Sequence, residues 1–160
     1  MCRERGLVAD QPVGFVGGSY GGYLSSCAAV FGSDVAACVA MFGHPDLLSA
    51  RFSSNNPAFY DRLVGGRVAG DQMGLAIERS PVFHAHEGAA PTLLLHGNRD
   101  ACTPSGQSEE FHRALLDAAV PTELVVYPGE GHGLRTPSVQ IDVWQRTIAW
   151  FDSHVKAVSV

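Results

Sequence analysis

The segment that most constrains the fold of this chain is the glycine-rich run Gly-Gly-Ser-Tyr-Gly-Gly at positions 17–22, which directly follows the apolar residues 13–16. A short apolar run predicts a buried strand, and the small residues after it predict a tight turn into a helix. Within the run, Ser19 stands in a G-x-S-x-G pattern, which at such a turn holds a serine on a strained and exposed corner. Gly17 and Gly21 meet the need for small neighbours there. Taken alone, the pattern fits an ordinary glycine-rich turn about as well as a reactive serine.

Two later segments contain the groups that a reactive serine requires, a base and an acid that orients the base. The apolar run 91–95 leads to Asp100, and the apolar run 123–127 leads to His132 in a glycine-rich loop. Because the carboxyl ends of parallel strands meet at the same edge of a sheet, we expect these two side chains to converge on Ser19. The order serine, acid, histidine is that of the α/β-hydrolases. The sequence therefore predicts a catalytic triad.

The backbone N–H of Tyr20 is the candidate for stabilising an oxyanion. We expect it at the N-terminus of the helix after the serine, where backbone N–H groups lack a partner inside the helix. Donors in such a position stabilise the negative charge that develops during acyl transfer. A second donor is not identifiable from the sequence.

Strands and helices alternate along the rest of the chain, which is typical of an α/β fold with a mostly parallel sheet flanked by helices. Residues 35–42 predict a second buried strand, whereas residues 46–80 lack strand character and predict a helical excursion over the site. Thr103 and Thr136 each precede a proline, a combination typical of a helix N-terminus.

The last predicted helix has a stripe of apolar residues that recur every three or four positions. We expect this stripe to pack on the sheet as part of the core rather than to bind a ligand. Its members are Ile141, Trp144, Ile148, Phe151 and Val155.

Composition and charge exclude several classes of partner. The net charge of −5 at pH 7 provides no basic surface for nucleic acid or for an anionic membrane. No apolar run approaches the ~18 residues of a transmembrane helix, and the N-terminal residues lack the apolar segment of a signal peptide. Cys27 and Cys38 lie in apolar surroundings that favour free thiols, and no C-x-x-C spacing occurs. The cytoplasm is therefore the expected compartment.

Several other polar residues are weaker functional candidates. His84, His86 and Glu87 form an H-x-H-E cluster, but no third ligand follows at a useful spacing, so neither a metal nor another cofactor is predicted. Tyr60 can contact the substrate only if the helical excursion (residues 46–80) folds over the site; otherwise it is a packing residue of the core. Cys102 is a weaker nucleophile candidate than the serine of the glycine-rich turn.

In combination, these motifs resemble the catalytic domain of the prolyl oligopeptidase family, in particular its acylaminoacyl-peptidase and dipeptidyl-peptidase-like branch. The resemblance extends from about Gly6 to His154 and rests on residues 17–23 (GGSYGGY), Ser80-Pro81, residues 91–100 (PTLLLHGNRD) and residues 131–133 (GHG). It implies an α/β-hydrolase that cleaves short or acylated peptides. The serine would then be the nucleophile, the aspartate the orienting acid and the histidine the general base.

The family pattern also predicts what this sequence lacks. Members of the family carry a β-propeller and early sheet strands ahead of the nucleophile, whereas here only residues 1–12 precede the first strand. We therefore expect residues 1–160 to form the C-terminal portion of an α/β-hydrolase catalytic domain, without the N-terminal strands and without a propeller. The strand edge left open would favour self-association.

Two other interpretations remain open from the sequence. The same triad serves carboxylesterases that hydrolyse small esters, so reaction class does not follow from the triad alone. A chain without the early strands is also consistent with an inactive fragment, or with a subunit that another chain completes.

Overall fold

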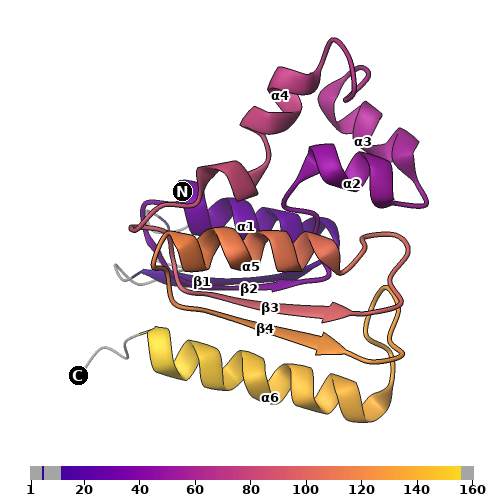
Figure 1. The fold of residues 1–160 in the computed structure, drawn as a ribbon. Helices are drawn as coiled ribbons and strands as arrows, with labels where there is room; N and C mark the ends of the chain where they lie inside the picture. The colour runs from indigo at the N-terminus through magenta and orange to yellow at the C-terminus, as the bar shows by residue number, and fades with distance from the viewer. Residues whose placement is uncertain (1–4, 6–11, 156–160) are drawn as a thin grey trace.

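The computed structural model describes Arg5 and residues 12–155, which form a parallel sheet with helices on both faces (Figure 1). The strands are β1 (Val13–Gly18), β2 (Val35–Met41), β3 (Thr92–Gly97) and β4 (Thr122–Tyr127). They lie in the order β1-β2-β3-β4, and each pairing is parallel. Because all the pairings are parallel, the carboxyl ends of the strands, and the loops that follow them, lie at the same edge of the sheet. The predicted α/β fold is confirmed.

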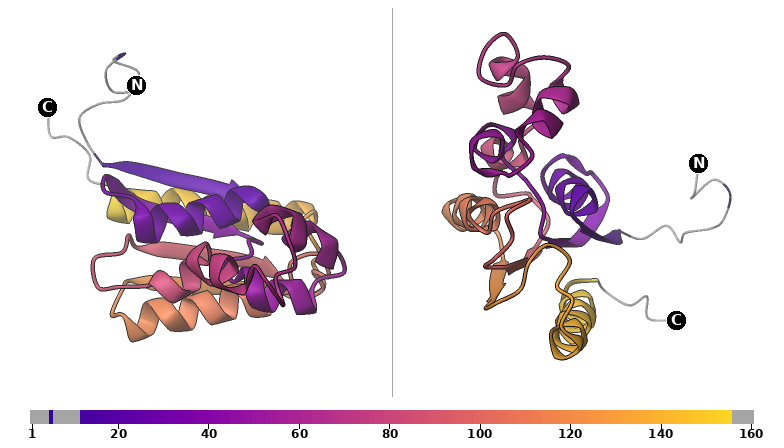
Figure 2. Two further views of the ribbon diagram at one scale, coloured as in Figure 1. Left: turned by 90° about the horizontal axis from the view of Figure 1, so that it is seen from above. Right: turned by 90° about the vertical axis from the view of Figure 1, so that its right-hand side faces the viewer.

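The helices divide between the two faces of the sheet. Helices α1 (Tyr20–Phe31) and α5 (Gly106–Asp117) cover one face, and α6 (Pro137–His154) covers the other (Figure 2). The segment between β2 and β3 forms the predicted helical excursion and projects from the side that carries α1 and α5 (Figure 1). It contains α2 (Leu47–Ser53), α3 (Pro57–Val64), α4 (Met73–Glu78) and a short 3-10 helix (Pro81–His84).

Alternate residues of the central strands pack into two separate cores. Ala40 and Leu94 face α5, where Phe111 and Leu115 are buried, and Val39 faces α6 on the opposite side. Burying an apolar side chain of this size contributes about 1.5–3 kcal/mol, so both helices hold the central strands in place. The strand ends that carry the site are therefore fixed from both faces.

The buried face of α6 is not the one that the sequence predicted. Three members of the predicted core stripe are exposed, namely Ile141 (60%), Trp144 (56%) and Ile148 (59%). The sheet instead contacts the face that contains the buried Val143 and Thr147, and of the predicted stripe Phe151 packs against this core. Because α6 carries apolar residues on two faces, its periodicity predicted a helix correctly but chose the wrong side.

One of the two predicted helix starts is also wrong. Helix α5 begins at Gly106 with Ser105 as its N-cap, because the hydroxyl of Thr103 has other partners in the loop after β3. Helix α6 begins as predicted, with Thr136 as N-cap and Pro137 in the first position. The Thr136 side chain makes no capping hydrogen bond.

The edge of the sheet, the cysteines and the helices each bear on a prediction from the sequence. Phe15 and Val16 of the edge strand β1 are 42% and 45% exposed. Cys27, Cys38 and Cys102 carry free thiols, whereas Cys2 lies outside the described residues. Among the helices that are described, none has the length and apolar character needed to cross a membrane.

Candidate active site

Ser19 lies at the sharp corner between β1 and α1, where its φ of 58° and ψ of −119° are unusual for a residue with a side chain. The corner requires small neighbours because two chain segments approach closely. A Cβ atom on Gly17 would lie 2.6 Å from the backbone of Gly21, and one on Gly22 would lie 2.5 Å from the carbonyl oxygen of Met41. A Cβ on Gly21 itself would meet nothing within 4 Å. The need for glycine therefore falls on Gly17 and Gly22, and the prediction for Gly21 is wrong.

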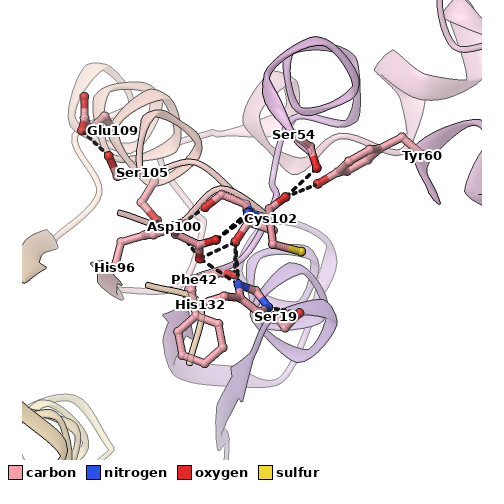
Figure 3. Close-up of polar contacts among 12 residues, drawn as sticks. Ser19, Phe42, Ser54, Tyr60, His96, Asp100, Cys102, Ser105, Glu109 and His132 are labelled. Atoms are coloured by element: carbon pink, nitrogen blue, oxygen red, sulfur yellow. Dashed lines mark hydrogen bonds and ion pairs between the residues drawn. The ribbon is translucent and has the colours of Figure 1, made fainter. Parts of the chain in front are cut away.

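His132 connects Ser19 to Asp100, as Figure 3 shows. Its Nε2 lies 2.9 Å from the Ser19 Oγ, and its Nδ1 lies 2.7 Å from the Asp100 Oδ2. An ionised carboxylate can only accept, so Nδ1 carries the proton and Nε2 has a lone pair for the serine hydroxyl. The structure thus brings together the three residues that the sequence predicted, in the geometry of a nucleophile, a base and an orienting acid.

The carboxylate of Asp100 is fully buried and has several donors around it. Its Oδ1 accepts the backbone N–H groups of Cys102 and Thr103, each at 2.9 Å. Burial raises the pKa of Asp100, but hydrogen bonds from His132, His96 and the Thr103 backbone outweigh burial and hold this pKa well below its usual range. The acid is therefore ionised at neutral pH and can orient the imidazole.

Three further residues surround the acid, and the sequence analysis assigned none of them to the site. The Thr103 hydroxyl lies 2.9 Å from both the Asp100 Oδ2 and the carbonyl oxygen of Phe42. The ring of Phe42 contacts the His132 imidazole edge-on, with centroids 5.0 Å apart. His96 binds the Thr103 carbonyl oxygen through its Nε2 at 2.5 Å. The only sequence signal among them, the Thr-Pro pair at Thr103, suggested a helix cap instead.

The backbone N–H of Tyr20 begins α1 immediately after the serine. Among residues 12–155, no carbonyl oxygen accepts this N–H, as expected for the first turn of a helix. The position is that of a donor available to an oxyanion at the serine.

A cavity of about 160 Å³ opens beside Ser19. Phe59 and Tyr60 of α3 line it, so the excursion does fold over the site, and the Tyr60 hydroxyl lies 3.5 Å from the Cys102 carbonyl oxygen (Figure 3). Burial, together with the nearby Asp100 charge, raises the pKa of the Cys102 thiol. The thiolate, which is the nucleophilic form of cysteine, is therefore disfavoured there.

The histidines of the H-x-H-E cluster have separate backbone partners. The Nε2 of His84 lies 2.9 Å from the carbonyl oxygen of Glu78, and the Nε2 of His86 lies 3.0 Å from that of Val30. In the described part of the chain, no three His, Cys, Asp or Glu side chains group as a metal site.

A parallel sheet with a serine at a strand-to-helix corner, and with an aspartate and a histidine after two later strands, defines an α/β-hydrolase. The chain belongs to the prolyl oligopeptidase family, whose family model matches residues 1–158.

Individual relatives agree with this membership. The chain is 28% identical over 141 residues to dipeptidyl peptidase family member 6 of Caenorhabditis elegans, and 27% identical over 158 residues to the acylamino-acid-releasing enzyme of Sus scrofa. The two matches cover 84% and 89% of this chain, but only 19% and 20% of the relatives. The solved structure of a puromycin-hydrolyzing peptidase of Mycobacterium tuberculosis superposes with a TM-score of 0.86 at 29% identity, covering 95% of this chain and 23% of that one.

Proposed function

We propose that this chain carries the catalytic site of a serine-type peptidase that hydrolyses short or acylated peptides through an acyl-enzyme. The observation that carries the proposal is the position of His132 between Ser19 and Asp100, at 2.9 Å and 2.7 Å. Hydrogen-bond contact on both sides of the imidazole is what a general base in nucleophilic catalysis requires.

In the proposed reaction, the Ser19 Oγ attacks the carbonyl carbon of the substrate while His132 takes the hydroxyl proton on Nε2. The imidazolium then gives this proton to the leaving amine. Asp100 keeps the proton of Nδ1 in place and stabilises the charged imidazole. The Tyr20 N–H donates to the oxyanion, and water later releases the acyl group by the same steps in reverse.

The peptide substrate class rests on the family and on the names of the relatives, a dipeptidyl peptidase and an acylamino-acid-releasing enzyme. The chain spans about one fifth of the length of these relatives. We therefore propose the peptidase activity for the protein to which this catalytic site belongs. A cavity beside Ser19 supports the proposal, since it offers room for one substrate side chain.

A fluorophosphonate probe tests the nucleophile directly. The probe should label the purified protein, and Ser19→Ala should abolish labelling while Ser138→Ala, an exposed serine at the start of α6, should not. His132→Gln should also remove labelling, because the serine is then not activated. Labelling that persists in Ser19→Ala would overturn the assignment.

The competing esterase reaction is tested by two substrates with the same acyl group. A peptidase should turn over an acyl-peptide anilide, whereas an esterase should turn over a simple aryl ester and leave the anilide intact. Hydrolysis of the ester alone would replace the peptidase proposal with the esterase one.

We also propose that copies of this chain associate through the open edge of β1. Within residues 12–155 no strand pairs with this edge, and the apolar Phe15 and Val16 are partly exposed along it. An unpaired apolar strand edge is a template for pairing with another strand.

A further inference from the structure

The hydroxyl group of Thr103 lies between Asp100 and the end of β2, and none of the reaction steps proposed above uses it. Thr103 is 2% exposed, and its Oγ1 lies 2.9 Å from both the Asp100 Oδ2 and the carbonyl oxygen of Phe42. The same oxygen lies 3.3 Å from the His132 Nδ1. A buried hydroxyl thus touches both the acid and the base of the candidate triad.

The Thr103 hydroxyl has one hydrogen for two acceptors. A hydrogen bond to an ionised acceptor is roughly twice as strong as one to a neutral acceptor, and Asp100 is ionised at neutral pH. The hydroxyl therefore donates to the Asp100 Oδ2, and the Phe42 carbonyl oxygen receives this hydrogen only when the hydroxyl turns away from the acid. As a result, the Oδ2 accepts two hydrogens, one from Thr103 and one from the His132 Nδ1 at 2.7 Å.

Two donors on one carboxylate oxygen share its negative charge. A hydrogen bond to the charged form of a carboxylic acid stabilises that form, so the Thr103 hydroxyl makes Asp100 a weaker base. A weaker base attracts a protonated imidazole less strongly. The hydroxyl therefore favours the neutral form of His132, which is the form that can accept the serine proton.

The second histidine near the acid, His96, does not replace this contact. Its Nε2 lies 3.5 Å from the Asp100 Oδ2 but only 2.5 Å from the carbonyl oxygen of Thr103. Both oxygens can only accept, so Nε2 carries a proton, and this proton points mainly to the closer carbonyl oxygen. The Nδ1 of His96 lies 2.7 Å from the Ser108 Oγ, away from the triad.

Three further titratable groups nearby are uncharged at neutral pH. Burial, together with the nearby His132, lowers the pKa of His44 to about 4, and burial raises the pKa of Tyr60 to about 12. Burial, together with the Asp100 charge, also raises the pKa of the Cys102 thiol. None of these groups therefore adds a charge beside the acid and the base.

We propose that Thr103 is a positioning residue of the triad, whose hydroxyl acts through Asp100 to keep His132 available as a base at neutral pH. This inference rests on the proposed function, in which His132 accepts the serine proton.

The pH dependence of fluorophosphonate labelling tests the proposal. Thr103→Val keeps the shape of the side chain but removes the hydroxyl, so the pH of half-maximal labelling rate should rise by about half a unit to one unit, as the loss of one hydrogen bond predicts. Thr103→Ser restores the hydroxyl and should return this pH close to that of the wild type.

Thr92→Val is the matched control for this measurement. It removes another buried threonine hydroxyl, which donates to the Ala90 carbonyl oxygen at 2.8 Å at the opposite end of β3. The pH of half-maximal labelling should be unchanged in this variant. An unchanged value in Thr103→Val, or an equal shift in Thr92→Val, would overturn the inference.

The Nδ1–H hydrogen of His132 provides a second measurement that needs no reaction at the serine. Proton NMR of the Ser19→Ala protein should show this hydrogen as a downfield signal that is lost in His132→Gln, and thermal unfolding verifies that each variant is folded. Adding Thr103→Val should move the signal further downfield, because Asp100 then accepts the Nδ1–H without competition from the hydroxyl. This shift in a protein that resists labelling would overturn only the proposed function. A signal at the same position with threonine and with valine would overturn the inference.

Discussion

At the scale of single residues, the Ser19 corner is held by hydrogen bonds on both sides of its strained backbone. The Ser19 N–H donates to the Met41 carbonyl oxygen at 3.0 Å, and the Ser19 carbonyl oxygen accepts the N–H of Tyr23 at 3.1 Å. A left-handed φ costs about 1–3 kcal/mol for a residue with a side chain and persists only where the surroundings enforce it. These two hydrogen bonds hold Ser19 in the left-handed conformation. The close packing of Gly17 against the Gly21 backbone and of Gly22 against the Met41 carbonyl oxygen holds it further.

The glycines around Ser19 should therefore differ sharply in their tolerance of alanine. Gly17→Ala and Gly22→Ala place a methyl group against the backbone and should lower the free energy of unfolding by about 1–3 kcal/mol. Gly21→Ala meets open space inside α1 and should raise it by about 0.5–1 kcal/mol, because alanine favours helix over glycine. Urea unfolding of the three variants measures these differences. A loss of stability in Gly21→Ala comparable to the other two would contradict the structure.

Asp100 should make the stability of the protein depend on pH. Its pKa in the folded state lies below the ~3.9 of an unfolded chain, so the folded state binds fewer protons in acid. The stabilisation is therefore present above about pH 4 and is lost as the pH falls through the folded pKa. Asp100→Asn should lower stability at neutral pH, and its difference from wild type should shrink as the pH falls below about 4. Chemical denaturation at a series of pH values measures the free energy of unfolding of both proteins. A difference between them that stays constant below about pH 4 would refute the prediction.

At the scale of the elements, α6 shows how far a periodic pattern can be trusted. The pattern predicted the helix and its start at Thr136, because a threonine followed by proline acts through local backbone geometry. It could not predict the buried face, which depends on what the sheet places opposite the helix. Val143 faces the sheet and Ile148 does not, although both are apolar β-branched residues.

This difference provides a matched pair of substitutions on α6. Val143→Ala should lower the free energy of unfolding by about 2 kcal/mol, because it removes buried methyl groups and leaves a cavity. Ile148→Ala removes more apolar atoms but from an exposed site, so its effect should stay within about 0.5 kcal/mol. Denaturant unfolding of the two variants measures these losses of stability. A larger loss for Ile148→Ala than for Val143→Ala would show that the helix face predicted from the sequence is the buried one.

The residues of the candidate site differ in the same way: local sequence determines the position of some, and tertiary packing determines the position of others. Ser19, Asp100 and His132 were predictable because each follows an apolar strand in a loop with its own sequence signal. Thr103 was misread, since its hydroxyl could serve a helix cap or a nearby acid, and only the folded chain decides. Tyr60 lines the cavity only because the excursion helices pack over the site, and no pattern in the sequence around it determines that packing.

At the scale of the whole molecule, the apolar edge of β1 should control association. Val16→Lys places a charge on this edge and should weaken association, because charged side chains on an edge strand oppose strand pairing. Phe83→Lys adds the same charge on the 3-10 helix before β3 and should leave association unchanged. Sedimentation velocity over a range of concentrations measures the difference. A monomeric wild-type protein at all concentrations would contradict the proposed contact.

The span of the Ser19–His132 hydrogen bond has a consequence for the order in which the protein becomes active. The two residues are 113 positions apart, and they meet only when β1 and the loop after β4 are both in place. Contacts of such long range form late, because the loop that they close is entropically costly. During synthesis on the ribosome, Ser19 therefore emerges long before His132, the residue proposed as its base. If Ser19 is the proposed nucleophile, its covalent labelling should begin only when the loop after β4 has docked beside β1, so labelling can report on that step of folding.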